Sequence, residues 1–155
     1  MTPAGVERYA SGVTRLELTR VRVCQRCGRS GAELRSRDGA VVVVPMDGAR
    51  ARELADDAGT SDGLESLTDL VLGQLAATGR APTEIVLDVL DGRLRALLSL
   101  PARDGPRVVG CTPEEGVALA VRGRIPLYAT DEALAHAAAR AARHERGSGG
   151  ADTLH

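Results

Sequence analysis

One stretch in the second half of the chain, residues 107–128, constrains the fold most, because strand, helix and strand signals follow one another there. Thr112 can cap a helix with its hydroxyl, Pro113 has the backbone φ of a first helical position, and Glu115 stands where a capping box needs its acceptor. The sequence therefore predicts a helix that begins at Pro113. Gly123 is expected to end this helix in the left-handed conformation, and a short strand should follow.

The other strand and helix signals are interspersed along the chain. Within residues 14–23 the apolar residues change phase near Thr19, which predicts a β-bulge. The dipeptide Asp91-Gly92 separates two apolar runs and favours the type I′ turn of a hairpin, whereas Pro45 is expected to end the strand before it. The expected strands cover residues 32–35, 40–44, 107–109 and 125–128, with two more inside 83–100, and the expected helices cover residues 48–58, 64–78, 113–123 and 131–146.

These elements predict an α+β fold, in which a mixed, largely antiparallel sheet with hairpins packs against three to four helices. A chain of 155 residues suits one compact domain. We assign that domain to residues 13–146. Residues 1–12 are expected to be a flexible lead-in, and residues 147–155 a disordered tail.

Composition limits the function classes. The chain has no Phe, no Trp and two Tyr, so its core must be aliphatic and stacking of bases on aromatic side chains is nearly excluded. All 20 basic residues are Arg, and the net charge is −1. Residues 1–40 hold eight Arg against four acids, whereas residues 47–69 hold seven acids against two Arg, which predicts a charge-polarised surface.

The sequence also bears on location and redox state. No apolar run approaches the roughly 18 residues of a membrane span, and the N-terminus lacks the layout of a signal peptide. We therefore expect a cytoplasmic protein that does not associate with membranes. The three cysteines, an odd number, favour thiols or a metal site over a disulfide framework.

With these elements placed, the chain resembles the bifunctional nuclease (BFN) family, whose members are credited with degrading both RNA and DNA. The resemblance covers about residues 16–135. It rests on Val44-Pro45, the acidic Ala-rich helix after it, the Leu-rich helix with Asp69, the Asp91-Gly92 hairpin that continues into Leu94 and Ala96, and above all residues 113–126. The resemblance implies a nuclease that hydrolyses phosphodiester bonds of RNA and DNA without sequence specificity.

Carboxylates are the first candidates for this chemistry, because phosphodiester hydrolysis needs an activated water and positive charge on the phosphorane. Glu115 and Asp69 match acidic positions of the family and are the candidate catalytic residues. Asp88 and Glu114 lie near the same elements, and two carboxylates brought together would form a Mg²⁺ or Mn²⁺ site. The alternatives are structural: Glu115 completes a capping box, and Asp69 suits a helix dipole.

Histidine is not expected to be the base. The three histidines, His136, His144 and His155, all lie late in the chain and outside the predicted core.

Arginines are the candidate nucleic-acid contacts. Arg20 and Arg22 alternate with valines and should face solvent together, while Arg122 and Arg124 flank the end of a helix. Such a group could contact phosphates independently of base sequence. The alternative is an ordinary solvated strand face.

Cys24 and Cys27 form a Cys-x-x-Cys-Gly motif, which is half of a zinc knuckle. A complete Zn²⁺ site would need Cys111 with a histidine, or a second chain. The alternative is a redox-active or simply reduced pair of thiols.

A second functional hypothesis is a non-catalytic regulatory or interaction module that keeps the fold, with zinc or a redox state at the Cys pair. It is favoured by departures from the family pattern: Thr112 and Leu97 replace Arg, Thr68 replaces His, and a Trp after Pro45 is missing. An aliphatic sheet face would also allow a homo-oligomer.

Overall fold

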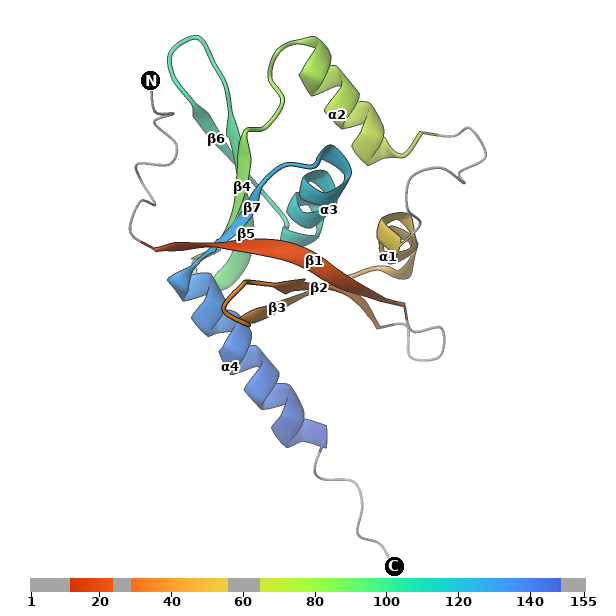
Figure 1. Ribbon diagram of the computed structural model, residues 1–155, viewed down its shortest axis with the longest axis vertical. Helices are drawn as coiled ribbons and strands as arrows, with labels where there is room; N and C mark the ends of the chain where they lie inside the picture. Colours follow the sequence, from red (N-terminus) through yellow and green to blue (C-terminus); the bar gives the residue numbers. More distant parts are fainter. Residues whose placement is uncertain (1–11, 24–28, 56–64, 149–155) are drawn as a thin grey trace, which may run out of the picture.

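The computed structural model describes residues 12–23, 29–55 and 65–148 (Figure 1). The elements in chain order are β1 (Val13–Val23), β2 (Ser30–Arg35), β3 (Val41–Met46), α1 (Gly48–Ala55), α2 (Leu67–Ala77), β4 (Glu84–Leu90), β5 (Arg93–Leu100), β6 (Arg107–Cys111), α3 (Pro113–Gly123), β7 (Leu127–Thr130) and α4 (Asp131–Ser148). α4 thus extends two residues into the segment predicted to be a tail.

The seven strands form one mixed sheet in the order β3-β2-β1-β7-β4-β5-β6. Every neighbouring pair is antiparallel except β4 and β7, which are parallel. β7 therefore joins two antiparallel units, β1–β3 and β4–β6, into one sheet. The predicted α+β fold, with a largely antiparallel mixed sheet packed against helices, is confirmed.

Two predicted backbone irregularities are confirmed by the register of the strands. The pairing of β1 with β2 shifts between Leu18 and Arg20, which places the bulge at Thr19. Asp91 and Gly92 both have positive φ, 53° and 71°, as a type I′ turn between β4 and β5 requires.

Other boundaries differ from the sequence prediction. Pro45 does not end β3, because β3 is an edge strand and the N–H that proline lacks is not needed there. The left-handed residue after α3 is Arg124, with φ 52°, rather than Gly123. β7 starts at Leu127, two residues later than predicted, because Ile125 still donates its N–H to Ala120 O at the end of α3.

The core is aliphatic and lies between the sheet and the helices. Leu16, Leu34, Ile85, Leu87 and Val117 are among its fully buried side chains. α1 and α3 pack against the strands, α2 packs on α3, and α4 contacts β3, β4 and β7 before extending away from the sheet (Figure 1).

The close packing of α3 on the sheet depends on a glycine. A Cβ placed at Gly116 would lie 2.2 Å from Cβ of Ala96 in β5. Only glycine therefore allows the first turns of α3 to approach the strand this closely.

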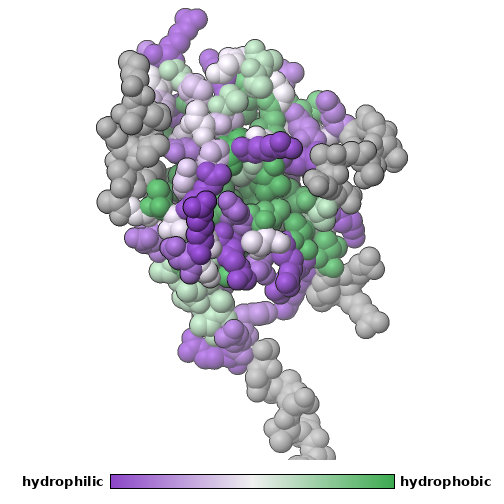
Figure 2. Space-filling view, viewed as in Figure 1, coloured by the Kyte–Doolittle hydropathy of each residue, from purple (hydrophilic) through white to green (hydrophobic). Residues whose placement is uncertain are grey.

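The surface combines charge with exposed aliphatic area. On the face seen in Figure 2, hydrophilic side chains are interspersed with hydrophobic ones. α2 is the most apolar exposed element, since Leu67, Leu70 and Val71 are 73%, 47% and 40% exposed. None of the helices in the described part of the chain is long and apolar enough to cross a membrane.

Candidate functional site

Glu115 is engaged by the start of its own helix. Its carboxylate accepts hydrogen bonds from the Thr112 backbone N–H at 3.1 Å and from the Thr112 hydroxyl at 2.9 Å, and its own N–H donates to Thr112 Oγ1 at 3.2 Å. These Thr112 bonds hold the pKa of Glu115 below its usual range. The predicted capping box is therefore present, and it occupies the carboxylate that the family resemblance made a catalytic candidate.

Asp69 docks α2 onto α3. Its carboxylate accepts two hydrogen bonds from the guanidinium of Arg122, with an Nε–Oδ1 distance of 3.1 Å, and a third from Ser66 Oγ at 3.0 Å. The bond from Arg122 is the main reason that the pKa of Asp69 is lowered. Arg122, a candidate phosphate contact, is thus committed to an ion pair within the protein.

Glu115 lies in the first turn of α3, whereas Asp69, which belongs to α2, is held near the other end of α3 by Arg122. Glu115 and Arg122, the partner of Asp69, are seven residues apart on the helix, which corresponds to about 10 Å along its axis. Asp88 is engaged elsewhere, by Thr130 Oγ1 at 2.7 Å. Among the residues that the structure describes, no group of three or more His, Cys, Asp or Glu side chains is placed to hold a metal ion.

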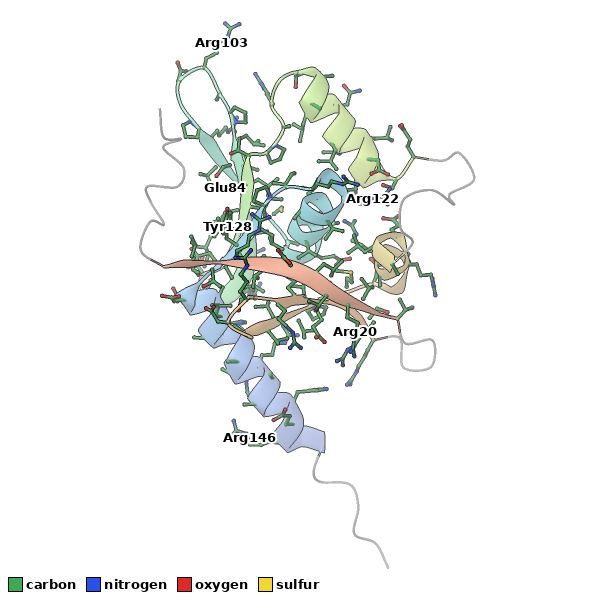
Figure 3. All side chains as sticks on the ribbon, viewed as in Figure 1. Arg20, Glu84, Arg103, Arg122, Tyr128 and Arg146 are labelled. Atoms are coloured by element: carbon green, nitrogen blue, oxygen red, sulfur yellow. The ribbon has the colours of Figure 1, made fainter. Side chains whose placement is uncertain are left out.

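The four candidate arginines do not form one surface. Arg20 and Arg22 lie on the outer face of β1, and Arg22 donates to Glu33 Oε2 at 3.1 Å. Arg122 lies beside α2, well away from Arg20 in Figure 3. Arg124 is exposed at the C-terminal end of α3.

Glu33 is the centre of the arginine group on the outer sheet face. It is only 8% exposed, and its carboxylate is bonded by Arg22 and by Arg35 at 3.3 Å. The Arg35 bond is the main cause of its lowered pKa. Glu33 therefore partly neutralises Arg22, one of the arginines predicted to contact phosphates.

Cys24 and Cys27 lie outside the described residues, so the predicted zinc or redox pair stays a prediction. Cys111 is a free thiol at the end of β6. Burial, helped by the nearby Glu115 carboxylate, raises its pKa to about 11. A thiol this hard to ionise is a poor nucleophile near neutral pH.

A pocket of about 480 Å³ lies at the start of α3, and we call it the α3 pocket. Four segments line it: the end of β3, the β4–β5 turn, the first turn of α3 and one face of α4. The lining residues are Val44, Pro45, Gly92, Arg93, Leu94, Thr112, Pro113, Glu114, His136 and Arg140. The volume is in the range of small-molecule sites in proteins.

Glu114 is the one carboxylate among the described residues of this lining, and its surroundings are distinctive. Its Oε1 accepts a hydrogen bond from the Asp47 backbone N–H at 3.4 Å and forms an ion pair with Arg50 Nε at 3.5 Å. Burial raises the pKa of Glu114, and the neighbouring Asp47 carboxylate raises it further. A carboxyl group whose pKa is moved toward neutrality is suited to proton transfer.

The other charged groups of the pocket are cationic or can become so. Arg93 comes from β5, and His136 and Arg140 lie four residues apart on α4, which places them on one face of that helix. Within the described part of the chain, neither Arg93 nor Arg140 has an ion-pair partner. The pocket can therefore attract an anion.

The sequence-based predictions include none of these three residues, and His136 lies late in the chain and outside the predicted core. The available signal is the four-residue spacing of His136 and Arg140 on the predicted helix. That spacing does not reveal that α4 returns to the β4–β5 turn and to β3, so only the fold brings these residues together.

The carboxylates nearest the α3 pocket are engaged within the protein. The Asp47 carboxylate accepts a hydrogen bond from the Arg50 N–H at 2.9 Å, and the Glu114 carboxylate is paired with the Arg50 guanidinium. Asp69 and Glu115 are likewise bonded to Arg122 and Thr112. The expected Mg²⁺ or Mn²⁺ site therefore stays a prediction.

Comparison with known proteins adds no assignment. No protein-family model matches the chain, and no curated protein matches it. The resemblance to bifunctional nucleases therefore stays a prediction from the motifs.

Proposed function

We propose that this protein is a nuclease that hydrolyses phosphodiester bonds of RNA and DNA without sequence specificity, and that it does so in the α3 pocket. The observation that carries the proposal is the convergence of Glu114, Arg93, His136 and Arg140 on one pocket. The motif resemblance to bifunctional nucleases supports the same reaction class.

The pocket offers each kind of group that the reaction needs. Cleavage of a phosphodiester requires a proton acceptor for the nucleophile, positive charge near the phosphorane oxygens and a proton donor for the leaving oxygen. Glu114 can accept the proton, Arg93 and Arg140 supply the positive charge, and His136 can donate. A Mg²⁺ or Mn²⁺ ion bound with the substrate phosphate would activate water as the nucleophile.

Purified protein incubated with single-stranded RNA and with plasmid DNA tests the proposal, in buffers that contain Mg²⁺, Mn²⁺ or EDTA. We expect cleavage of both substrates by the wild type in at least one metal. Glu114→Gln and Arg140→Ala should each reduce it by about 10²-fold or more, whereas Asp69→Asn should not, since Asp69 is paired with Arg122. No cleavage by stoichiometric protein in any buffer would overturn the proposal.

A second candidate function is a non-catalytic interaction module, possessing the same fold. It is favoured by α2, whose Leu67, Leu70 and Val71 are exposed although apolar helices are normally buried. A homo-oligomer formed through α2 is the simplest form of this candidate. Sedimentation of the wild type beside Leu67→Gln/Leu70→Gln tests it: a wild-type dimer that the double variant dissociates supports it, and a wild-type monomer excludes self-association.

The same candidate includes the Cys pair. Metal analysis of protein purified without a His tag should find about one Zn²⁺ per chain, or per two chains, if Cys24 and Cys27 bind structural zinc. Less than about a tenth of an equivalent would exclude that role.

A further inference from the structure

Two groups that can transfer protons line the α3 pocket from different elements. Glu114 lies in the first turn of α3, and His136 lies in the second turn of α4. Both side chains are partly buried. A pocket with a carboxylate on one helix and an imidazole on another can remove one proton and deliver another within the same substrate.

The cations of the pocket are available to a ligand. Arg93 and Arg140 are exposed and, among the described residues, hold no ion pair, in contrast to Arg22, Arg35, Arg50 and Arg122, each of which is bonded to a carboxylate. A phosphate between Arg93 and Arg140 would therefore gain charge-assisted hydrogen bonds without breaking existing pairs.

We propose, on the basis of the nuclease function proposed above, that the α3 pocket cleaves RNA by acid–base transesterification, with Glu114 as base and His136 as acid. The Glu114 carboxylate takes the proton of the ribose 2′-hydroxyl, and the 2′-oxygen attacks the adjacent phosphorus. The P–O5′ bond breaks, and the leaving 5′-oxygen takes a proton from the His136 imidazolium. The products are a 2′,3′-cyclic phosphate and a 5′-hydroxyl, and Arg93 and Arg140 stabilise the charge on the phosphorane.

This route is specific to RNA, because the nucleophile belongs to the substrate and DNA lacks the 2′-hydroxyl. It needs no metal-bound water. Among its described lining residues the pocket has no Phe, Tyr or Trp, so bases are not held by stacking on such a ring. Contacts confined to phosphate and ribose predict cleavage without strong base preference.

The experiment uses the full chain, an RNA oligonucleotide, the same oligonucleotide with 2′-deoxyribose throughout, and EDTA in every reaction. We expect the RNA to be cleaved to cyclic-phosphate and 5′-hydroxyl ends and the deoxy substrate to stay intact. Glu114→Gln and His136→Asn should each lower kcat by about 10²-fold or more. His144→Asn, on the same helix but outside the pocket, and Glu53→Gln on α1 are the matched controls and should keep wild-type rates.

The pH profile provides a readout that a structural role would not change. Activity should rise with pH as Glu114 loses its proton, which gives the profile an acidic limb. The groups that face Glu114 are Asp47, which favours its protonated form, and Arg50, which favours the carboxylate. Glu114→Gln should abolish the acidic limb in the residual activity, while the circular dichroism spectrum and the melting temperature show that the variant is folded.

The outcomes separate this inference from the nuclease function. Cleavage of both substrates that depends on Mg²⁺ or Mn²⁺ and leaves 5′-phosphate ends would overturn transesterification but support the nuclease. Wild-type rates in folded His136→Asn would also overturn it. The absence of any cleavage, with or without metal, would overturn both.

Discussion

The Asp69 carboxylate in α2 and the Arg122 guanidinium in α3 form a two-bond ion pair across the interface of these helices. The two residues are 53 positions apart in the chain. α2 is apolar, is largely exposed and contacts the rest of the described fold mainly through α3. The pair therefore fixes the position of a helix that otherwise has little to hold it.

Asp69→Asn should destabilise the fold by about 1 kcal/mol at pH 7, because both side chains are partly exposed and solvent screens the pair. Arg122 lowers the pKa of Asp69, so this stabilisation is present above the unfolded pKa of about 3.9 and is lost as the pH falls toward the folded value. Urea unfolding at several pH values measures it. The difference between wild type and variant should shrink as the pH falls below about 3.9. Asp104→Asn in an exposed loop should show none.

Gly116→Ala should destabilise the protein by about 1–3 kcal/mol, since the new methyl group would overlap Ala96 in β5 and force α3 away from the sheet. Gly73→Ala in α2 is the matched control, because nothing lies within 4 Å of its added Cβ. The control should gain about 0.5–1 kcal/mol from improved helix propensity. Equal melting temperatures for the two variants would contradict the close contact.

Arg124→Gly should stabilise the protein by about 1 kcal/mol, because Arg124 adopts φ 52° at the end of α3, a conformation that costs less for glycine. Arg124→Ala removes the same charge but keeps the unfavourable conformation, so it should bring no gain. Denaturant unfolding of the two variants distinguishes backbone conformation from charge. A gain in both would show that charge repulsion is responsible.

Compared with wild type, Glu114→Gln should gain stability as the pH rises from 3 to 7, while activity is lost. The folded pKa of Glu114 is raised by burial and by Asp47, so the wild-type side chain contributes its full stability below the unfolded pKa of about 4.3 and loses it as the pH rises through the folded value. Melting curves from pH 3 to pH 7 measure this. A residue kept for its chemistry at a cost in stability behaves this way. The assignment would be contradicted if the stability of the variant minus that of the wild type decreased between pH 3 and pH 7.

Cys111 should alkylate slowly near neutral pH, because burial raises its pKa to about 11. In a Cys24→Ser/Cys27→Ser background, the rate with iodoacetamide should rise about tenfold for each pH unit between pH 8 and pH 10. Free cysteine under the same conditions should level off near pH 9. A plateau for Cys111 at that pH would mean that the thiol is solvated.

The local elements were predictable from sequence because their signals are local. The cap at Thr112, the turn at Asp91-Gly92 and the bulge at Thr19 each follow from a few neighbouring residues. The Arg124 cap was not, because Gly123 looked like the left-handed residue. A Cβ at Gly123 would lie 3.0 Å from Leu72 Cδ2, so this glycine also serves the packing of α2 on α3.

The candidate site was harder to predict than the fold. Glu114 was recognised as one of several carboxylates, but Glu115 beside it matched the family pattern better. The spacing from Thr112 already assigns Glu115 to the cap, but the raised pKa of Glu114 depends on Asp47, which reaches it from the end of β3. Such long-range contacts leave no pattern in a single sequence.

The position of β7 sets the order in which the strands of the sheet can pair during synthesis. β1 pairs with β7 through Val13–Thr130 to Leu16–Leu127, so the first described strand finds one of its two neighbours only near the end of the chain. On the ribosome, β1–β3 and β4–β6 can each form antiparallel pairs early, but each unit keeps an open edge until the four residues of β7 emerge. Folding to one sheet is then a late, long-range step, and truncation before residue 127 should release two unjoined, aggregation-prone halves rather than a shortened domain.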